Sequence, residues 1–227
     1  MSRKYQEDIF LNEEGDKWFE RNFENTNAGL EKRILRDRVI LSFELLNVIP
    51  RNILEVGCSD GWRLEGLRKK YKCKCSGIDP SSRAVNHGKS AYPNIELNVS
   101  TADTLPYQDD LFDSVIIGFC LYLCDREKLF KIAYEVDRVL KNNGNLFILD
   151  FDPSFAYKNE YSHRESVFSY KMQYVNMFIW NPAYKQIYHE SFSSDGGRTI
   201  DNNPDERISV DILRKNIDYA YPLSPYR

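Results

Sequence analysis

Short apolar runs alternate with amphipathic segments from residue 52 onward, and this alternation restricts the fold more than any other feature of the chain. The apolar runs read as strands at 52–56, 74–79, 95–99, 112–119 and 145–151. Between them, helix patterns lie at about 61–71, 82–91 and 126–141. Strands that alternate with helices in this way form a parallel sheet with helices on both faces. Such sheets bind ligands at the carboxyl ends of their strands.

The flanking segments follow other patterns. A short helical pattern at 16–23 follows a polar stretch, and a longer amphipathic helix is predicted at 30–48, before Pro50. Beyond Asp152, Tyr, Phe, Ser and Asn are frequent, and strand patterns return at 184–192 and 207–215.

These patterns predict one α/β domain with three parts. They are a helical cover at 1–50, a ligand-binding core at 51–152, and an elaboration with the last strands at 153–227.

Composition excludes several classes of protein. The net charge of −3 provides no general attraction to nucleic acid or to an anionic membrane. The longest apolar stretch, 115–124, is about half the length of a membrane span, and the first ten residues contain no apolar signal region. The five cysteines include no C-x-x-C pair, which predicts reduced thiols in a cytoplasmic protein without a metal site. The basic cluster at 68–74 is interpreted as a helix C-terminus.

The turn after the first strand, in ILEVGCSDG at 53–61, fits two chemistries. As G-x-S-x-G it matches the nucleophile elbow of a serine esterase, with Ser59 attacking. As a glycine-bearing turn after a first strand it matches a nucleotide-cofactor site. Chain order permits the esterase, because Asp150 or Asp152 is followed by His163 or His189.

Two acids favour the cofactor site. Glu55 lies near the end of the first strand and Asp79 ends the second. An acid at the end of the second strand can bind a nucleotide ribose, because one carboxylate accepts hydrogen bonds from two adjacent hydroxyls. The turn has Ser59 where a dinucleotide loop has its second glycine, and no Walker lysine follows Gly61. Each acid taken alone could instead cap a turn or a helix.

Three stretches in order, ILEVGCSDG, GIDPS and ADTLPYQDDLFDSVIIGF, resemble the motifs of class I S-adenosylmethionine-dependent methyltransferases. The resemblance covers roughly 52–152. It implies a Rossmann-like, seven-stranded, mostly parallel sheet with an antiparallel C-terminal strand, and S-adenosylmethionine as cofactor with S-adenosylhomocysteine as product. It assigns Asp79 to the ribose and Asp103 to the adenine amino group. Further cofactor contacts are expected at Glu55, Gly57, Cys58, Ser59, Gly61, Pro80, Ala102 and Thr104.

The helical segment 13–22 resembles the cover of related methyltransferases. We expect Trp18 to pack over the cofactor and Arg21 to approach its carboxylate; the alternative is that Trp18 belongs to the core. Phe119 and Tyr122, after the fourth strand, are expected to line the site, although core packing would also suit Tyr122.

The acceptor is expected to be a small polar molecule, with O-methylation of a sugar or a related metabolite as the leading hypothesis. The polar and aromatic 153–205 segment, which is vaguely similar to methyltransferases of bacterial polysaccharide synthesis, would contact it. His163 and Asp152 are the candidate general bases, because both follow the fifth strand; a solvated loop histidine is the alternative for His163. A non-catalytic protein that binds the cofactor remains a rival hypothesis. The sequence NPAY at 181–184 follows the fifth strand and is interpreted as a turn, not a nucleic-acid methyltransferase motif.

Overall fold

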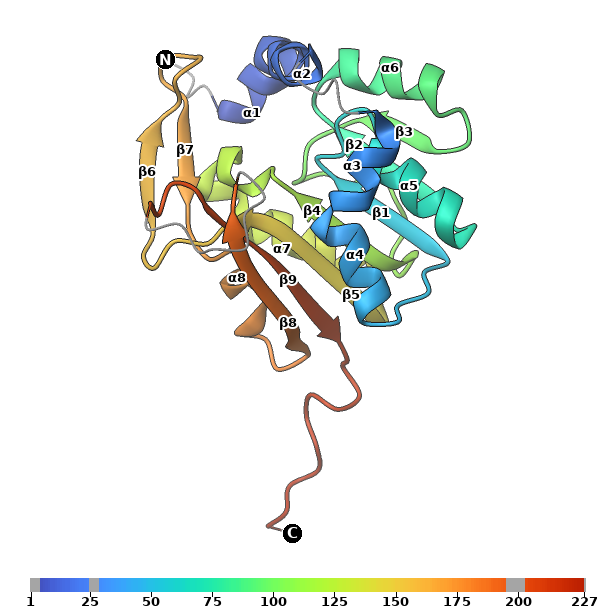
Figure 1. The fold of residues 1–227 in the computed structure, drawn as a ribbon. Coiled ribbons are helices and arrows are strands. Elements are labelled where there is room, and N and C mark those ends of the chain that lie inside the picture. The colour runs from blue at the N-terminus through green and yellow to red at the C-terminus, as the bar shows by residue number, and fades with distance from the viewer. Residues whose placement is uncertain (1–4, 25–28, 195–202, 227) are drawn as a thin grey trace.

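A seven-stranded sheet with the order β3-β2-β1-β4-β5-β9-β8 forms the centre of the fold (Figure 1). The computed structural model describes residues 5–24, 29–194 and 203–226. β1 to β5 run parallel, β9 is antiparallel to β5, and β8 is antiparallel to β9. The strands are β1 (Asn52–Val56), β2 (Lys74–Asp79), β3 (Glu96–Val99), β4 (Phe112–Gly118), β5 (Leu140–Phe151), β8 (Tyr184–Ser193) and β9 (Arg207–Lys215). The predicted Rossmann-like, mostly parallel sheet is confirmed.

Helices cover both faces of the sheet because successive side chains of its central strands are apolar. On β1, Ile53 packs in the cluster that includes α4 and α5, while Leu54 packs in the cluster that includes α7. One face is covered by α4 (Arg38–Leu45), α5 (Trp62–Tyr71) and α6 (Ser82–Ala91), the other by α7 (Leu129–Val139) and α8 (Asn176–Ile179). No helix in the described part of the chain has the length and apolar character needed to cross a membrane.

Helix in the N-terminal cover begins before the helical pattern predicted at 16–23. The cover contains α1 (Gln6–Ile9), a π-helical turn η1 (Phe10–Glu14) and α2 (Gly15–Glu24), so helix begins within the polar stretch that precedes that pattern. α2 lies beside α6 (Figure 1), where the Asp16 carboxylate accepts hydrogen bonds from the Ser81 hydroxyl and the Arg83 amide. These contacts are tertiary and leave no periodic signal in the sequence.

The predicted helix at 30–48 is two helices, α3 (Leu30–Arg36) and α4, with Asp37 between them. The Asp37 backbone is extended, and its carboxylate accepts the Ile40 amide at 2.9 Å as an N-cap. An aspartate that caps the next helix in this way ends the preceding one.

A second, two-stranded sheet follows β5. β6 (Tyr157–Glu160) and β7 (Phe168–Lys171) form an antiparallel hairpin, of which only β7 has a strand pattern in the sequence. The 3-10 turns η2 (Leu121–Leu123) and η3 (Arg126–Lys128) follow β4. The hairpin contacts η2, so both surround the carboxyl end of the large sheet.

A buried ion network supports that end of the sheet. Arg63 of α5 forms ion pairs with Glu55 of β1 and, at 3.0 Å, with Asp37. Burial raises the pKa of Glu55 to about 7, although the Arg63 charge opposes this shift. A Cβ atom on Gly118 would lie 2.8 Å from Arg63 Nη1, so the guanidinium lies directly against the end of β4.

Replacing Arg63 by methionine should destabilise the protein by about 3–5 kcal/mol at pH 8, because a buried carboxylate pair loses its cation. Without Arg63 the pKa of Glu55 rises further above its unfolded value, so the folded state binds a proton that the unfolded state does not. Stability of Arg63→Met should therefore fall as pH rises from 5 to 8, more steeply than in the wild type.

Urea denaturation at several pH values measures this effect. The double variant Arg63→Met/Glu55→Gln should recover part of the lost stability at pH 8 and lose most of the pH dependence. A single variant as stable as the wild type at pH 8 would contradict the role given to this network.

Candidate functional site

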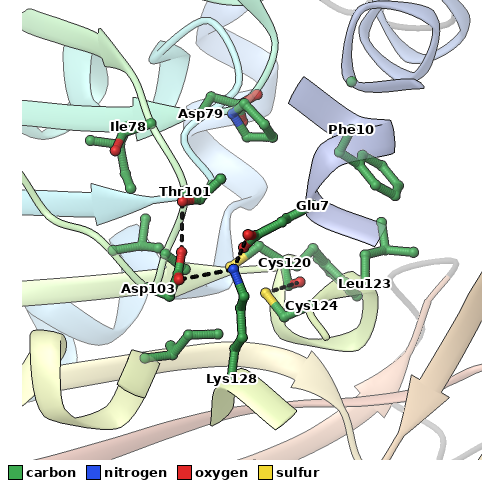
Figure 2. A pocket seen from close by; sticks show the side chains of 18 of the residues that line it. Glu7, Phe10, Ile78, Asp79, Thr101, Asp103, Cys120, Leu123, Cys124 and Lys128 are labelled. Carbon is green, nitrogen blue, oxygen red and sulfur yellow. Dashed lines mark hydrogen bonds and ion pairs between the residues drawn. The ribbon is translucent and has the colours of Figure 1, made fainter. Parts of the chain in front are cut away.

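A cleft opens at the carboxyl end of the parallel strands, between the sheet and the N-terminal cover. It encloses about 870 Å³, counting its opening to solvent. We call it the cofactor cleft. Its walls come from the ends of β1, β2 and β4, from the loop after β3, from η2 and α7, and from α1, η1 and α2 of the cover (Figure 2).

The turn after β1 forms one wall, and its backbone requires glycine. Gly57 has φ +76° and Gly61 has φ +79°. Glycine adopts this left-handed region of backbone conformation readily, whereas residues with a Cβ atom rarely do. A Cβ on Gly57 would lie 2.7 Å from Cys120 Cβ, so a side chain there would displace η2. Ser59, at φ +51°, donates its amide to Asp79 Oδ2 at 2.8 Å.

Asp79 ends β2 with its carboxylate at the cleft wall (Figure 2). Oδ2 accepts the Ser59 amide and Oδ1 accepts the Ser81 amide at 2.9 Å. Burial raises the pKa of Asp79 to about 6, and the two amides oppose this shift. A carboxylate offers about four lone-pair positions, so two remain for hydroxyl donors in the cleft.

Asp103 lies at the other end of the cleft and is 4% exposed. Its Oδ1 accepts the Thr101 hydroxyl at 2.7 Å, and its Oδ2 pairs with Lys128 at 3.1 Å and Lys131 at 3.2 Å. Lys128 also pairs with Glu7 of α1, which links the cover to the core across the cleft (Figure 2).

The structure brings together most residues that the sequence assigned to the cofactor. Those that line the cofactor cleft are Trp18, Gly57, Ser59, Asp79, Pro80, Ala102, Asp103 and Phe119. Six others are not in its lining: Arg21, Glu55, Cys58, Gly61, Thr104 and Tyr122. Glu55 is 1% exposed and faces Arg63, and Gly61 begins α5, where a Cβ would lie 2.6 Å from Ile95 Cδ1. Glu55 and Gly61 therefore lie behind the turn. Thr104 belongs to the loop after β3, where its carbonyl accepts from the Ser100 hydroxyl.

A second cleft meets the cofactor cleft at Trp18, which lines both. We call it the acceptor-side cleft. It lies among α2, η2 and the β6–β7 hairpin, and its lining contains Arg21, Asn22, Tyr122, Phe151, Asn159, Glu160, Tyr161, Ser162, His163, Ser169 and Lys171. Arg21 and Tyr122 are thus on the acceptor side of Trp18 and do not line the cofactor cleft.

The two candidate bases are far from equivalent. His163 is exposed, lines the acceptor-side cleft, and packs edge-on against Tyr161 with ring centroids 5.3 Å apart. Asp152 is 4% exposed and lines neither cleft; its oxygens accept from Gln173 at 3.0 Å and from Ser191. The structure does not bring Asp152 together with His163.

Sequence reasoning missed several residues of the two clefts. Glu7 and Lys128 reach the cofactor cleft, and Lys171 reaches the acceptor-side cleft, with its Nζ 2.9 Å from Asp205 Oδ1 and 4.0 Å from the Phe151 ring centroid. None of these residues belongs to a local motif, and each is placed by pairing with a residue distant in sequence.

The turn serine has no esterase geometry. Within the described residues, no histidine forms a hydrogen bond or ion pair with Ser59, whose amide instead contacts Asp79. His189 pairs with Asp211 at 2.7 Å and lies 3.0 Å from Ser191, on β8 and β9. A nucleophile elbow requires a base within hydrogen-bond reach of the serine.

Comparison with known proteins agrees with this geometry. Residues 53–144 match the family described as a methyltransferase domain. Ajmaline N-methyltransferase of Rauvolfia serpentina is 34% identical over 117 residues, which are 46% of this chain and 39% of that protein. Norajmaline N-methyltransferase of the same plant is 25% identical over 181 residues, 77% of this chain and 59% of that protein. The chain therefore spans less than two thirds of the length of either relative.

The fold also matches solved structures. N-methyltransferase NodS from Bradyrhizobium japonicum, solved with S-adenosyl-L-homocysteine, superposes with a TM-score of 0.62 at 17% identity, covering 93% of this chain and 97% of that one. Motif order, sheet topology and the domain match over residues 53–144 agree, and together they support a class I S-adenosylmethionine-dependent methyltransferase.

Proposed function

We propose that this protein transfers a methyl group from S-adenosylmethionine to a hydroxyl oxygen of a small polar acceptor, a sugar or a related metabolite. The observation that carries the proposal is the pair of clefts that meet at Trp18. One has acids at the positions where a nucleoside would be held. The other combines aromatic rings with hydrogen-bonding side chains.

The cofactor cleft fits the nucleoside at both ends. Asp79 would accept from the ribose hydroxyls through its two remaining lone-pair positions. Asp103 Oδ1 accepts one hydrogen bond from the described residues, that of the Thr101 hydroxyl, and could also accept one from the adenine amino group. The turn at Gly57 and Ser59 would face the methionine portion, and Trp18 would cover it. When bound, the cofactor supplies an electrophilic methyl group on a sulfonium.

The acceptor-side cleft suits a molecule with an apolar face and several hydroxyls. Aromatic rings come from Trp18, Tyr122, Phe151 and Tyr161. Such rings pack against the C–H face of a sugar, while amides and hydroxyls fix its orientation. Asn159, Ser162 and Ser169 provide these groups at the same cleft.

Methyl transfer to a hydroxyl requires removal of a proton. His163 lies at the acceptor-side cleft with an imidazole nitrogen available to accept one, and the edge contact with Tyr161 restricts its ring. Tyr122 is a weaker candidate, because burial and the nearby Asp150 raise its pKa. Asp152 has no part in the proposed step, since both its oxygens are engaged outside the cleft.

An amine acceptor is the second candidate. The alkaloid relatives and NodS are all named N-methyltransferases. A neutral amine attacks with its own lone pair and needs no base before transfer. The two candidates therefore differ in their dependence on His163.

The acceptor class can be tested by transfer of a labelled methyl group to matched pairs of sugars and amino sugars, free and nucleotide-linked. We expect transfer to the hydroxyl compounds. Transfer confined to amino compounds would replace the O-methylation hypothesis by N-methylation. Binding of S-adenosylhomocysteine without transfer to any acceptor would favour the non-catalytic alternative.

His163→Ala should lower kcat toward a hydroxyl acceptor by ~10²–10⁴-fold, because the proton acceptor is lost. Its affinity for S-adenosylhomocysteine, measured by calorimetry, should not change. Glu165→Gln is the matched control, since it alters an exposed residue of the same loop that lines neither cleft. Near-normal turnover of His163→Ala would remove the histidine from the proposed step.

Asp79→Asn should weaken S-adenosylhomocysteine binding about tenfold or more, since hydrogen bonds to a charged acceptor are worth about 1.5–3 kcal/mol. The hydroxyl donors favour the ionised carboxylate, whose pKa is about 6 in the free protein. Wild-type affinity should therefore rise as pH increases through 6 and then level off.

Calorimetric titration from pH 5 to 8 measures both effects. The pH dependence should be absent in Asp79→Asn and retained in Asp109→Asn, which changes an exposed carboxylate on the loop before β4. The same affinity in Asp79→Asn and the wild type would refute the ribose assignment.

A further inference from the structure

Two cysteines lie together at the end of the sheet opposite the cofactor cleft. Cys73 precedes β2 and Cys75 is in it, and their sulfur atoms are 3.6 Å apart. At the usual rise of a strand, Cys75 lies roughly 13 Å from Asp79 at the other end of β2. The pair is therefore separate from the proposed methyl-transfer site.

A third cleft gives access to this pair, although the residues are only 8% and 4% exposed. Both cysteines line it, together with three cationic side chains and one acidic one. The cations are Arg68, Lys72 and Lys74, and the acid is Glu96. Arg68 is paired with Glu65 at 2.7 Å. Lys72 and Lys74 are therefore the cations that would attract an anionic reagent to the thiols.

The two thiols are not equivalent. The hydrogen bond between the two thiols lowers the pKa of Cys73, although burial and the charge of Asp113 oppose this shift. The same hydrogen bond and burial raise the pKa of Cys75. Cys73 therefore ionises first, and the thiolate is the nucleophilic form of cysteine.

Backbone geometry permits a bond between the two sulfurs. Residues two positions apart in extended chain have Cα atoms about 6.6 Å apart, within the range of about 4.4–6.8 Å found for disulfides. Although Cys73 precedes β2, its sulfur lies 3.6 Å from that of Cys75, so the two side chains point to the same side. Forming the bond requires the sulfurs to approach to about 2.05 Å and the Cβ atoms to lie about 3.5–4.5 Å apart.

We propose that Cys73 and Cys75 form a reversible dithiol–disulfide site that reacts with small disulfides carrying carboxylates, of the oxidised-glutathione class. The Cys73 thiolate attacks one sulfur of the reagent, whose S–S bond breaks and releases a thiolate. Cys75, after losing its proton, attacks the Cys73 sulfur and displaces the second thiolate. Two electrons pass from the protein thiols to the reagent, which leaves as two thiols carrying the protein's protons.

The cations of the cleft would hold the carboxylates of the reagent. Their effect can be separated from thiol reactivity by comparing oxidised glutathione with cystamine, a cationic disulfide. Folded protein is incubated with each, and peptide mapping by mass spectrometry follows the fragment that carries both cysteines. Mapping also separates this pair from Cys120 and Cys124, which line the cofactor cleft.

Oxidised glutathione should remove two hydrogens from the Cys73–Cys75 fragment, severalfold faster than cystamine does. Cys75→Ser should stop at a mixed disulfide on Cys73, and Cys73→Ser should react far more slowly at Cys75. The variant Lys72→Asn/Lys74→Gln should lose the preference for glutathione and keep its reactivity with cystamine. Lys89→Gln, which removes an exposed lysine outside this cleft, should behave as the wild type.

Failure of the folded protein to form the Cys73–Cys75 bond, or its formation only in urea, would overturn the proposal. Equal rates with the two disulfides would overturn the choice of an anionic reagent. Affinity for S-adenosylhomocysteine should be the same in oxidised and reduced protein. This readout separates failure of the dithiol proposal from failure of the methyl-transfer proposal.

Discussion

The contact between the Asp79 carboxylate and the Ser59 amide joins the two strands on which the cofactor cleft depends. β1 and β2 are parallel neighbours, so the turn after one reaches the last residue of the other. Because Asp79 also accepts the Ser81 amide, the same carboxylate arranges the start of α6. Ser81 then caps α6 through its hydroxyl and reaches Asp16 of the cover. Asp79 thereby connects the turn, α6 and, through Ser81, the cover to the end of β2.

Behind this turn, charge is buried where apolar packing would be expected. Glu55 and Asp37 come from separate elements, and Arg63 lies between them. Among residues 5–24, 29–194 and 203–226, none forms a hydrogen bond with Glu55 Oε2, so this part of the network carries an unsatisfied oxygen. Removing one partner of a buried ion network destabilises a protein strongly, whereas replacing all its members by well-packed apolar side chains often does not. Its value here is positional, because Arg63 lies against Gly118 and thus against the end of β4.

The two clefts are formed by different parts of the fold. The cofactor cleft is built largely from strand ends, whose relative positions follow from parallel pairing. The acceptor-side cleft is assembled from α2, η2 and the β6–β7 hairpin, which are distant in sequence. Trp18 belongs to both, so the cover that would close over the cofactor also forms a wall for the acceptor.

The sequence by itself determined the parallel core and the positions of Gly57 and Asp79, because strand periodicity and glycine turns are local signals that parallel pairing converts into a common edge. Asp103 followed from the resemblance of the motifs to class I methyltransferases. The sequence did not determine the break at Asp37, the early start of the cover, the hairpin at β6, or the roles of Glu7, Lys128 and Lys171. Nor did it distinguish His163, at a cleft, from Asp152, enclosed by Gln173 and Ser191. These features depend on ion pairs and hydrogen bonds between residues far apart in the chain. Only the tertiary structure decided them, since a long-range partner leaves no periodic trace in the sequence around either residue.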